Sequence, residues 1–560
     1  MAAISSGQGP IDWQDKVTAK RRQQQESIPS DWTIDSAVID GLTNVLEVPV
    51  TCALLTSKEI EITSADVPVL LHNIAQGIWT SVQVTTAFCK RAVIAHQLTN
   101  CLTEVYIDDA LKRAAELDDY LKQHGTVVGP LHGLPVSLKD QFCIKGREAT
   151  MGYVSWIGKL AKDDAGVVKL LIENGAVLYV KTNVPQTLMW GETFNNVFGR
   201  TLNPHNTNCT SGGSTGGEGA LIALRGSVLG VGTDIAGSIR IPSHYNGVYG
   251  FKPSSHRVPT FGMVNSLDGQ DSIATSAGPL ASSVSGLKVF MQTILSSRPW
   301  TVDPSLIRKP WDEEAYGLAD HGRGDTLCFG ILWEDGHLKP HPPISRALLM
   351  AKRALEQAGH KVIDWVPLQH RELNTNAVSG FIFIPPQYVL FKLNTDSSEL
   401  SRGADPSEIP PFRQPRQPLS AFELWQLHKE RRELRQAYFD HWNGTKNVTG
   451  TGRPVDAIIA PVMPYTSLPH GSTGPATYTL VFSTLDCPSL VVPVTKVDPA
   501  VDVKAAPHQF SGDDDEALYN IYDPELLAGL PVGLQVVGQR HEEEAILAMG
   551  AILDDALKQL

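Results

Sequence analysis

Three residues of this chain have side chains suited to acyl transfer without a histidine: Lys139, Ser214 and Ser238. Both serines lie in glycine-rich runs, GGSTGGEG (212–219) and GTDIAGSIR (232–240). A serine hydroxyl becomes an effective nucleophile when a neighbouring base takes its proton, and a neutral lysine amine can be that base. Alone, a Gly-Gly-Ser sequence is usually a flexible turn, and a Lys-Asp sequence is usually a surface ion pair. Their joint occurrence indicates a hydrolase site.

The lysine must lose its charge before it can accept a proton. Lys139 follows LPVSL (134–138), an apolar run that predicts a buried strand. Burial disfavours the protonated amine, and lowering its pKa by about three, which costs roughly 4 kcal/mol, would leave it largely neutral near pH 7. The carboxylate of Asp140 would oppose this if it faced the amine, so we expect it to point elsewhere.

The small residues IAGS (235–238) can turn successive backbone N–H groups toward one point, which makes a nest for an oxyanion. The rival interpretation of the first glycine-rich run is a phosphate loop. A Walker loop needs a Gly-Lys-Ser/Thr step, and no lysine occurs between Lys181 and Lys252. A dinucleotide fingerprint should follow a strand, whereas residues 203–210 are polar and contain a proline. Both alternatives are therefore weak.

The elements around these motifs alternate between helices and strands, which predicts an α/β protein with a sheet covered on both faces. Ser81 is predicted as an N-cap, and Ser420 with Glu423 as a capping box. The proline-rich stretch 385–419 is interpreted as an insertion. Helices are predicted at 13–25, 81–96, 108–123, 163–173, 345–357, 420–441 and 542–560, and strands at 134–138, 176–181, 228–231, 361–365, 455–461 and 490–497.

Composition narrows the function classes. A formal net charge of -13 over 560 residues argues against binding to nucleic acids or anionic membranes. Seven scattered cysteines without CxxC spacing predict reduced thiols in a cytosolic protein. We expect no signal peptide, no transmembrane helix and a cytoplasmic location. The chain lacks HExxH and any Cys/His cluster with zinc spacing, so neither a metal nor another cofactor is expected.

The glycine-rich blocks resemble the motifs of the amidase signature family. The matching segments are GLPVSLKD (133–140), GGSTGG (212–217), GTDIAGSIRIP (232–242) and GLPVGLQ (529–535). A closer resemblance is to the fungal acetamidases, carried by IPSDW (28–32), TAFCKRA (86–92), QLTNC (97–101), KTNVPQTLM (181–189) and HPPI (341–344). Fatty acid amide hydrolase resembles the chain more distantly, and its membrane-anchoring apolar segment has no counterpart here.

The resemblance, which runs from about residue 60 to the C-terminus, implies the amidase signature fold. That fold is a single large domain with a central mixed, twisted β-sheet covered by helices on both faces. We expect it to span residues 61–560, with residues 1–60 as an N-terminal helical extension packed on the core. Relatives indicate a homodimer.

The resemblance also implies a Ser-cisSer-Lys triad. Ser238 would be the nucleophile, Ser214 the bridging serine after a cis Gly213–Ser214 peptide bond, and Lys139 the base. Both serines would also contact the substrate. The backbone of Ile235, Ala236, Gly237 and Ser238 would form the oxyanion hole.

Other positions match family roles in support of this triad. Leu188 aligns with a substrate-contacting position, and Asp234 and Arg240 would hold the nucleophile loop. The family often has Ser at Thr215 and Gly at Ala236. Thr215 keeps a hydroxyl, so its supporting role should survive, while the methyl of Ala236 should narrow the acyl pocket.

Together these residues predict an amidase that cleaves linear amide C–N bonds, not peptide bonds, through an acyl-enzyme. Its substrates would be small and medium amides such as acetamide, and their hydrolysis would give a carboxylic acid and ammonia or an amine. Segments 185–198 and 381–420 are expected to shape the acyl pocket. Three alternatives stay open: a carbamate or ester hydrolase with the same triad, a glutamine amidotransferase subunit, and a non-catalytic binding module. The acetamidase-like N-terminus disfavours the second, and the complete triad disfavours the third.

Overall fold

The structure is a computed structural model that describes residues 13–381 and 419–560. The predicted insertion at 385–419 lies outside the described residues except for Leu419, so its contribution to the acyl pocket stays a prediction. The proposed division of the chain at residue 60 also stays a prediction.

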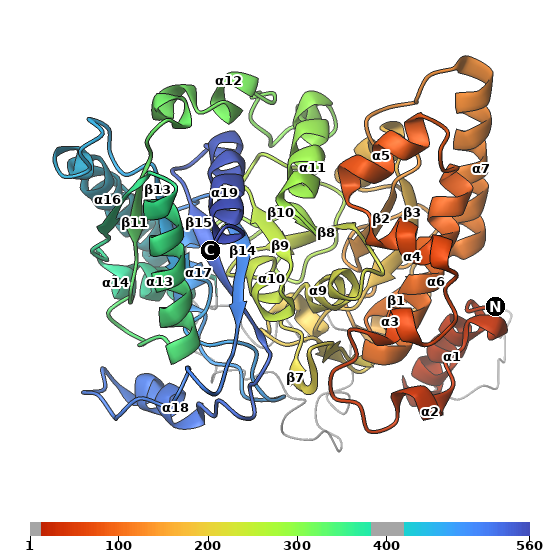
Figure 1. The fold of residues 1–560 in the computed structure, drawn as a ribbon, viewed down its shortest axis with the longest axis horizontal. Helices are drawn as coiled ribbons and strands as arrows, with labels where there is room; N and C mark the ends of the chain where they lie inside the picture. The colour runs from red at the N-terminus through yellow and green to blue at the C-terminus, as the bar shows by residue number, and fades with distance from the viewer. Residues whose placement is uncertain (1–12, 382–418) are drawn as a thin grey trace, which may run out of the picture.

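One mixed sheet of 11 strands forms the centre of the molecule, in the order β1-β3-β2-β8-β10-β9-β14-β15-β13-β11-β12 (Figure 1). This sheet confirms the predicted α/β fold. Its strands are β1 (Leu102–Val105), β2 (Pro135–Lys139), β3 (Val177–Thr182), β8 (Leu229–Asp234), β9 (Tyr249–Lys252), β10 (Ser276–Ala281), β11 (Cys328–Ile331), β12 (Lys361–Asp364), β13 (Ala457–Pro461), β14 (Ser489–Lys496) and β15 (Pro531–Val537). Two small hairpins pair β4 (Phe194–Asn195) with β5 (Gly199–Arg200) and β6 (Leu202–Asn203) with β7 (Asn206–Thr210).

Helices surround this sheet, with α1 and α7 at one end of the molecule and α14, α16 and α18 at the other (Figure 1). None of the described helices is long and apolar enough to cross a lipid bilayer. The α-helices are α1 (Trp13–Glu26), α2 (Ser36–Ile39), α3 (Val48–Thr51), α4 (Ser57–Ser64), α5 (Val67–Ala75), α6 (Ser81–Thr99), α7 (Ile107–His124), α8 (Gly166–Glu173), α9 (Gly216–Ala223), α10 (Arg240–Asn246), α11 (Val284–Ser296), α12 (Glu313–Tyr316), α13 (Pro342–Gln357), α14 (His370–Phe381), α16 (Ala421–Gly444), α17 (Thr477–Thr484), α18 (Asp513–Ile521) and α19 (Glu543–Leu557).

The register of β14 and β15 shows that helices cover both faces of the sheet. Gln535 of β15 lies opposite Val491 of β14, so both side chains share a face, and Leu490 points to the other face because side chains alternate along a strand. Gln535 accepts a hydrogen bond from Arg240 of α10. On the opposite face α19 packs closely: a Cβ added to Gly550 would lie 2.8 Å from Leu490. Because both its faces are covered, β15 is buried along its whole length.

Capping residues in the local sequence determine where α6 and α16 begin. α6 is capped by Thr80, which forms a capping box with Gln83, so the predicted N-cap at Ser81 is wrong by one residue. Thr80 and Gln83 carry the capping-box pattern, and Ser81 is the first helical residue. The capping box predicted for Ser420 and Glu423 is confirmed at the start of α16.

The site residues cluster because two strands that carry them run side by side. β2 ends on Lys139 and β8 ends on Asp234, and these neighbours are parallel, with Leu138 opposite Val231. Their carboxyl ends therefore meet at one edge of the sheet. That places the lysine beside the segment that continues from β8 to Ser238.

Candidate active site

Lys139 is fully buried at the end of β2. Its Nζ donates to Ser214 Oγ at 2.7 Å and to Thr233 Oγ1 at 2.8 Å. Burial lowers the pKa of Lys139 from 10.5 to about 7, against the opposing charges of Asp234 and Glu218. A substantial fraction of this amine is therefore neutral at neutral pH, as the sequence predicted.

Asp140 points away from the neighbouring lysine amine. Its carboxylate accepts hydrogen bonds from Thr103 Oγ1 at 2.9 Å and from the backbone N–H of Met151 at 2.8 Å, and it lies 3.6 Å from Lys181 Nζ. The expectation that Asp140 faces other partners is confirmed. Its negative charge is paired with Lys181 instead of holding a proton on Lys139.

Ser214 lies just before α9, and only 2% of it is exposed. The Gly213–Ser214 peptide bond is cis, as the family resemblance implies. Gly213 has no room for a side chain, because an added Cβ would overlap the carbonyl oxygen of Trp190. The next residue, Thr215, donates its N–H to the carbonyl oxygen of Ser238 at 3.2 Å, which joins the two serine segments.

Ser238 is partly exposed and lines a cavity at the end of the segment that follows β8. Among the described residues, the backbone N–H groups of Ile235, Ala236 and Ser238 have no hydrogen-bond acceptor. The N–H of Gly237 donates to Asp234 at 2.8 Å. Three of the four predicted oxyanion donors are thus free, and the fourth holds the turn in shape. Gly237 has φ of 137°, a backbone conformation that favours glycine.

A buried ion pair fixes this turn. Asp234 accepts hydrogen bonds from Nε and Nη2 of Arg240, both at 3.0 Å, as well as from the N–H groups of Gly237 and Ile239. Burial alone would raise the pKa of Asp234, but the charge and hydrogen bonds of Arg240, together with the charge of Lys252 and the N–H of Ile239, lower that pKa to about 2. The carboxylate therefore stays ionised, and its hydrogen bonds hold the turn in one conformation.

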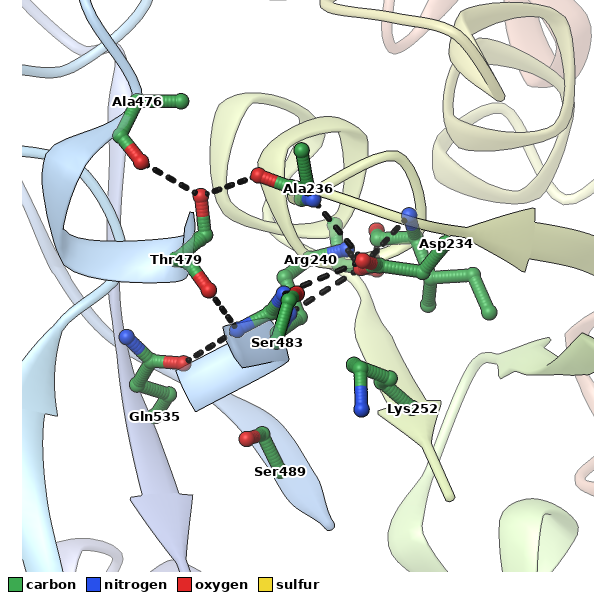
Figure 2. Close-up of polar contacts among 12 residues, drawn as sticks. Asp234, Ala236, Arg240, Lys252, Ala476, Thr479, Ser483, Ser489 and Gln535 are labelled. Atoms are coloured by element: carbon green, nitrogen blue, oxygen red, sulfur yellow. Dashed lines mark hydrogen bonds and ion pairs between the residues drawn. The ribbon is translucent and has the colours of Figure 1, made fainter. Parts of the chain in front are cut away.

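Arg240 extends the same network to distant parts of the chain (Figure 2). Its guanidinium donates to the carbonyl of Thr479 at 2.9 Å, to Ser483 Oγ at 2.7 Å and to Gln535 Oε1 at 3.2 Å. In turn Thr479 Oγ1 donates to the carbonyl of Ala236 at 2.6 Å. The segment that carries Ser238 is therefore fastened to α17 and β15.

Glu218 was not predicted as a site residue. It is fully buried in the first turn of α9 and accepts hydrogen bonds from Ser137 Oγ at 2.6 Å and Thr182 Oγ1 at 3.1 Å. Burial raises its pKa to about 8, against these bonds and the charge of Lys139. Ser137 and Lys139 share a face of β2 because they are two residues apart. The two-residue spacing could therefore have predicted that Ser137 and Lys139 lie close together. Nothing in the local sequence indicates that Glu218 packs beside them.

A cavity of about 830 Å³ opens beside Ser238. It brings together the predicted contact residues Leu188, Ile235, Ala236, Gly237 and Ser238, whereas Ser214, which is buried, is not part of its lining. Sequence reasoning missed the contributions of α14, α17 and α18, which come from far along the chain. From these elements and the loop before α17 the lining takes Arg371, Asn374, Thr375, Val378, Ser379, Ser472, Thr473, Gly474, Pro475, Ala476, Thr477, Leu480, Asp514, Ala517, Leu518 and Ile521.

Comparisons with known proteins indicate the family of this chain. A sequence model of the family described as Amidase matches residues 83–547. An acetamidase of Aspergillus oryzae is 40% identical over 542 residues, which covers 96% of this chain and 97% of that protein. An acetamidase of Emericella nidulans is 39% identical over 545 residues, covering 96% and 97%. Among solved structures, a fatty acid amide hydrolase superposes with a TM-score of 0.89 at 33% identity, covering 98% of this chain and 95% of that one.

Proposed function

Because the chain belongs to the amidase family and is an amide-hydrolysing enzyme, we propose that it cleaves small to medium carboxylic acid amides through an acyl-enzyme on Ser238. Lys139 would act as the base and Ser214 as the hydroxyl that links it to the nucleophile. The observation that carries this proposal is the buried Lys139 amine, 2.7 Å from Ser214 Oγ. Its pKa, lowered to about 7, supports the role because a base works best when its pKa is near the working pH.

The proposed reaction begins with two proton transfers. Neutral Lys139 accepts the proton of Ser214, which accepts the proton of Ser238 as the Ser238 oxygen attacks the amide carbon. The free N–H groups of Ile235, Ala236 and Ser238 would donate to the resulting oxyanion. The C–N bond then breaks, and the relay returns the proton to the leaving ammonia or amine. Water attacks the Ser238 ester by the same route and releases the carboxylic acid.

The nucleophile can be tested with a fluorophosphonate, which reacts covalently with activated serines. We expect the wild-type protein to be labelled at one serine and Ser238→Ala not to be labelled. Ser472→Ala is a matched control, because Ser472 lines the same cavity, whereas the side-chain hydrogen bonds of Lys139 go to Ser214 and Thr233; it should be labelled like the wild type. Labelling of Ser238→Ala at the wild-type rate would refute the assignment.

The substrate class can be tested by ammonia or amine release from acetamide, a longer aliphatic amide, an anilide and ethyl carbamate. We expect the purified protein alone to hydrolyse amides faster than the carbamate. A higher rate on the carbamate would favour the alternative hydrolase function. Hydrolysis of glutamine only when other proteins are added would favour an amidotransferase subunit.

A further inference from the structure

One side chain in the cavity wall is buried without the hydrogen bonds that it needs. Asn374 of α14 is 9% exposed and lines the cavity that contains Ser238. Neither its Nδ2 nor its Oδ1 has a hydrogen-bond partner among the described residues. A carboxamide removed from water with neither its donor nor its acceptor satisfied is unfavourable. Its position in the wall of an open cavity indicates a polar group of a ligand as the partner.

Among the described residues that line the cavity, only Asn374 has buried side-chain polar atoms without a partner; Asn376 Oδ1 also lacks one, but Asn376 is not part of the lining. Asn376, two residues along α14, donates from Nδ2 to the carbonyl of Leu427 at 3.0 Å and to Glu430 at 2.7 Å, which docks the helix on α16. Thr477 and Thr473, in the same cavity wall, donate to buried carboxylates of Asp335 and Glu192, both at 2.6 Å. These side chains serve the fold, whereas Asn374 is left for the cavity.

The part of the cavity near the nucleophile is apolar. Ile235 and Leu480 belong to one buried apolar cluster, against which Met189 and Val378 pack, and all four line the cavity. A ligand that reaches from Ser238 to Asn374 would therefore need a hydrocarbon middle and a polar far end. The volume of about 830 Å³ exceeds what acetamide can fill and lies within the range of roughly 300–1,000 Å³ typical of sites for larger ligands.

We propose that Asn374 binds a second carboxamide-like group of the substrate, so that the enzyme prefers aliphatic amides with a terminal carboxamide or ureido group. A carboxamide offers a donor and an acceptor together, which satisfy both Oδ1 and Nδ2 of Asn374. A carboxylate offers acceptors only and leaves Oδ1 facing negative charge, and an alkyl end satisfies neither atom. The inference rests on the proposed function, because it places the scissile amide at Ser238.

A length series tests the preference. Diamides H₂N–CO–(CH₂)n–CO–NH₂ are compared with monoamides CH₃–(CH₂)n–CO–NH₂ for each n from 2 to 8, by kcat/KM from ammonia release. At the best n we expect the wild type to favour the diamide by about tenfold or more, after correction for its two equivalent amides. In Asn374→Leu, which has a similar shape but no polar atoms, this ratio should fall close to one.

The same diamide and monoamide series serves for the control variant and for the results that would overturn the inference. Glu372→Gln changes an exposed residue of the same helix outside the cavity lining, so it should keep the wild-type ratio. A ratio near one at every n in the wild type, or equal losses on both series in Asn374→Leu, would overturn the inference and leave that end of the cavity to solvent. Asn374→Asp is a second variant, expected to shift preference from terminal carboxamides to terminal amines.

Binding separates this inference from the proposed function. If the wild type hydrolyses none of these amides, the proposed function fails, while the Asn374 contact is still tested by calorimetric titration of diamide and monoamide into Ser238→Ala. We expect Ser238→Ala/Asn374→Leu to bind the diamide about tenfold more weakly than Ser238→Ala, with a much smaller change for the monoamide. Equal dissociation constants for the diamide would overturn the inference.

Discussion

Replacing Lys139 with methionine should stabilise the protein while removing its activity. The fold lowers the pKa of this amine from 10.5 to about 7, mainly by burial. A drop of about 3.5 corresponds to roughly 5 kcal/mol of unfolding free energy lost by keeping the protonated amine inside. Methionine removes that penalty but leaves the hydroxyls of Ser214 and Thr233 without the amine, at about 1 kcal/mol each. The expected gain at low pH is therefore about 3 kcal/mol.

The gain should depend on pH in a direction that the lowered pKa fixes. Below pH 7 the amine is protonated in the folded and unfolded wild type, so the penalty is complete. Between pH 7 and 10.5 the folded protein has released a proton that the unfolded chain still holds, so wild-type stability rises with pH. Above 10.5 both states are neutral and no penalty remains. The advantage of Lys139→Met should therefore shrink as pH rises from 7.

Urea unfolding at pH 6, 8 and 10, followed by tryptophan fluorescence and circular dichroism, measures this difference, and amide turnover is measured on the same samples. Turnover should fall by about 10²–10⁴ because the proposed general base is gone. Lys181→Met is the matched control: Lys181 is as buried but is paired with Asp140, so its loss should destabilise. A Lys139→Met variant no more stable than wild type at pH 6, or equally stabilised at pH 6 and 10, would refute the reasoning. Near-normal turnover would identify another base.

Three further outcomes are expected. The kcat/KM of the wild type should rise with pH along a limb near pH 7 and level off above it, because in the proposed mechanism only neutral Lys139 accepts a proton; a limb below pH 5 would contradict this. Arg240→Leu should lower the unfolding free energy by about 3–5 kcal/mol in urea unfolding, because it leaves the charge of Asp234 buried without its partner; a loss below about 1 kcal/mol would argue against the ion pair. Gly230→Ala should lower the unfolding free energy by about 1–3 kcal/mol, seen as a reduced midpoint in thermal unfolding, because the added methyl would overlap the Glu218 carboxylate; an unchanged midpoint would mean that the carboxylate can move aside.

Much of the secondary structure could be predicted because it depends on local patterns. The apolar run before Lys139 forms β2, and the predicted segments in the described part match observed elements with ends displaced by at most three residues. The order of the 11 strands could not be predicted. β15 lies between β13 and β14, and that placement depends on pairing energies between segments far apart in the chain, which no local pattern contains.

The site divides in the same way. Ser214 and Ser238 stand in glycine-rich motifs and Lys139 follows an apolar run, so sequence alone could group them. The second contact of Lys139, with Thr233, depends on the parallel register of β2 and β8. Asn374 lies in a helix whose sequence does not indicate which side faces the cavity. Its importance depends on hydrogen bonds that are missing, and only the assembled structure can show that.

The contacts of Arg240 with residues far along the chain also bear on the order in which the site is completed during synthesis. Its guanidinium contacts Gln535, 295 residues further along the chain. A ribosome delivers the N-terminal part first, so a nascent chain has displayed both serines and the lysine long before β15 exists. Until that strand emerges, Arg240, which holds the turn that carries Ser238, lacks one of its hydrogen-bond partners. A chain truncated before residue 531 would carry Lys139, Ser214 and Ser238 and still lack the hydrogen bond from Arg240 to Gln535. By the proposed mechanism, we therefore expect hydrolysis to become possible only when translation is nearly complete.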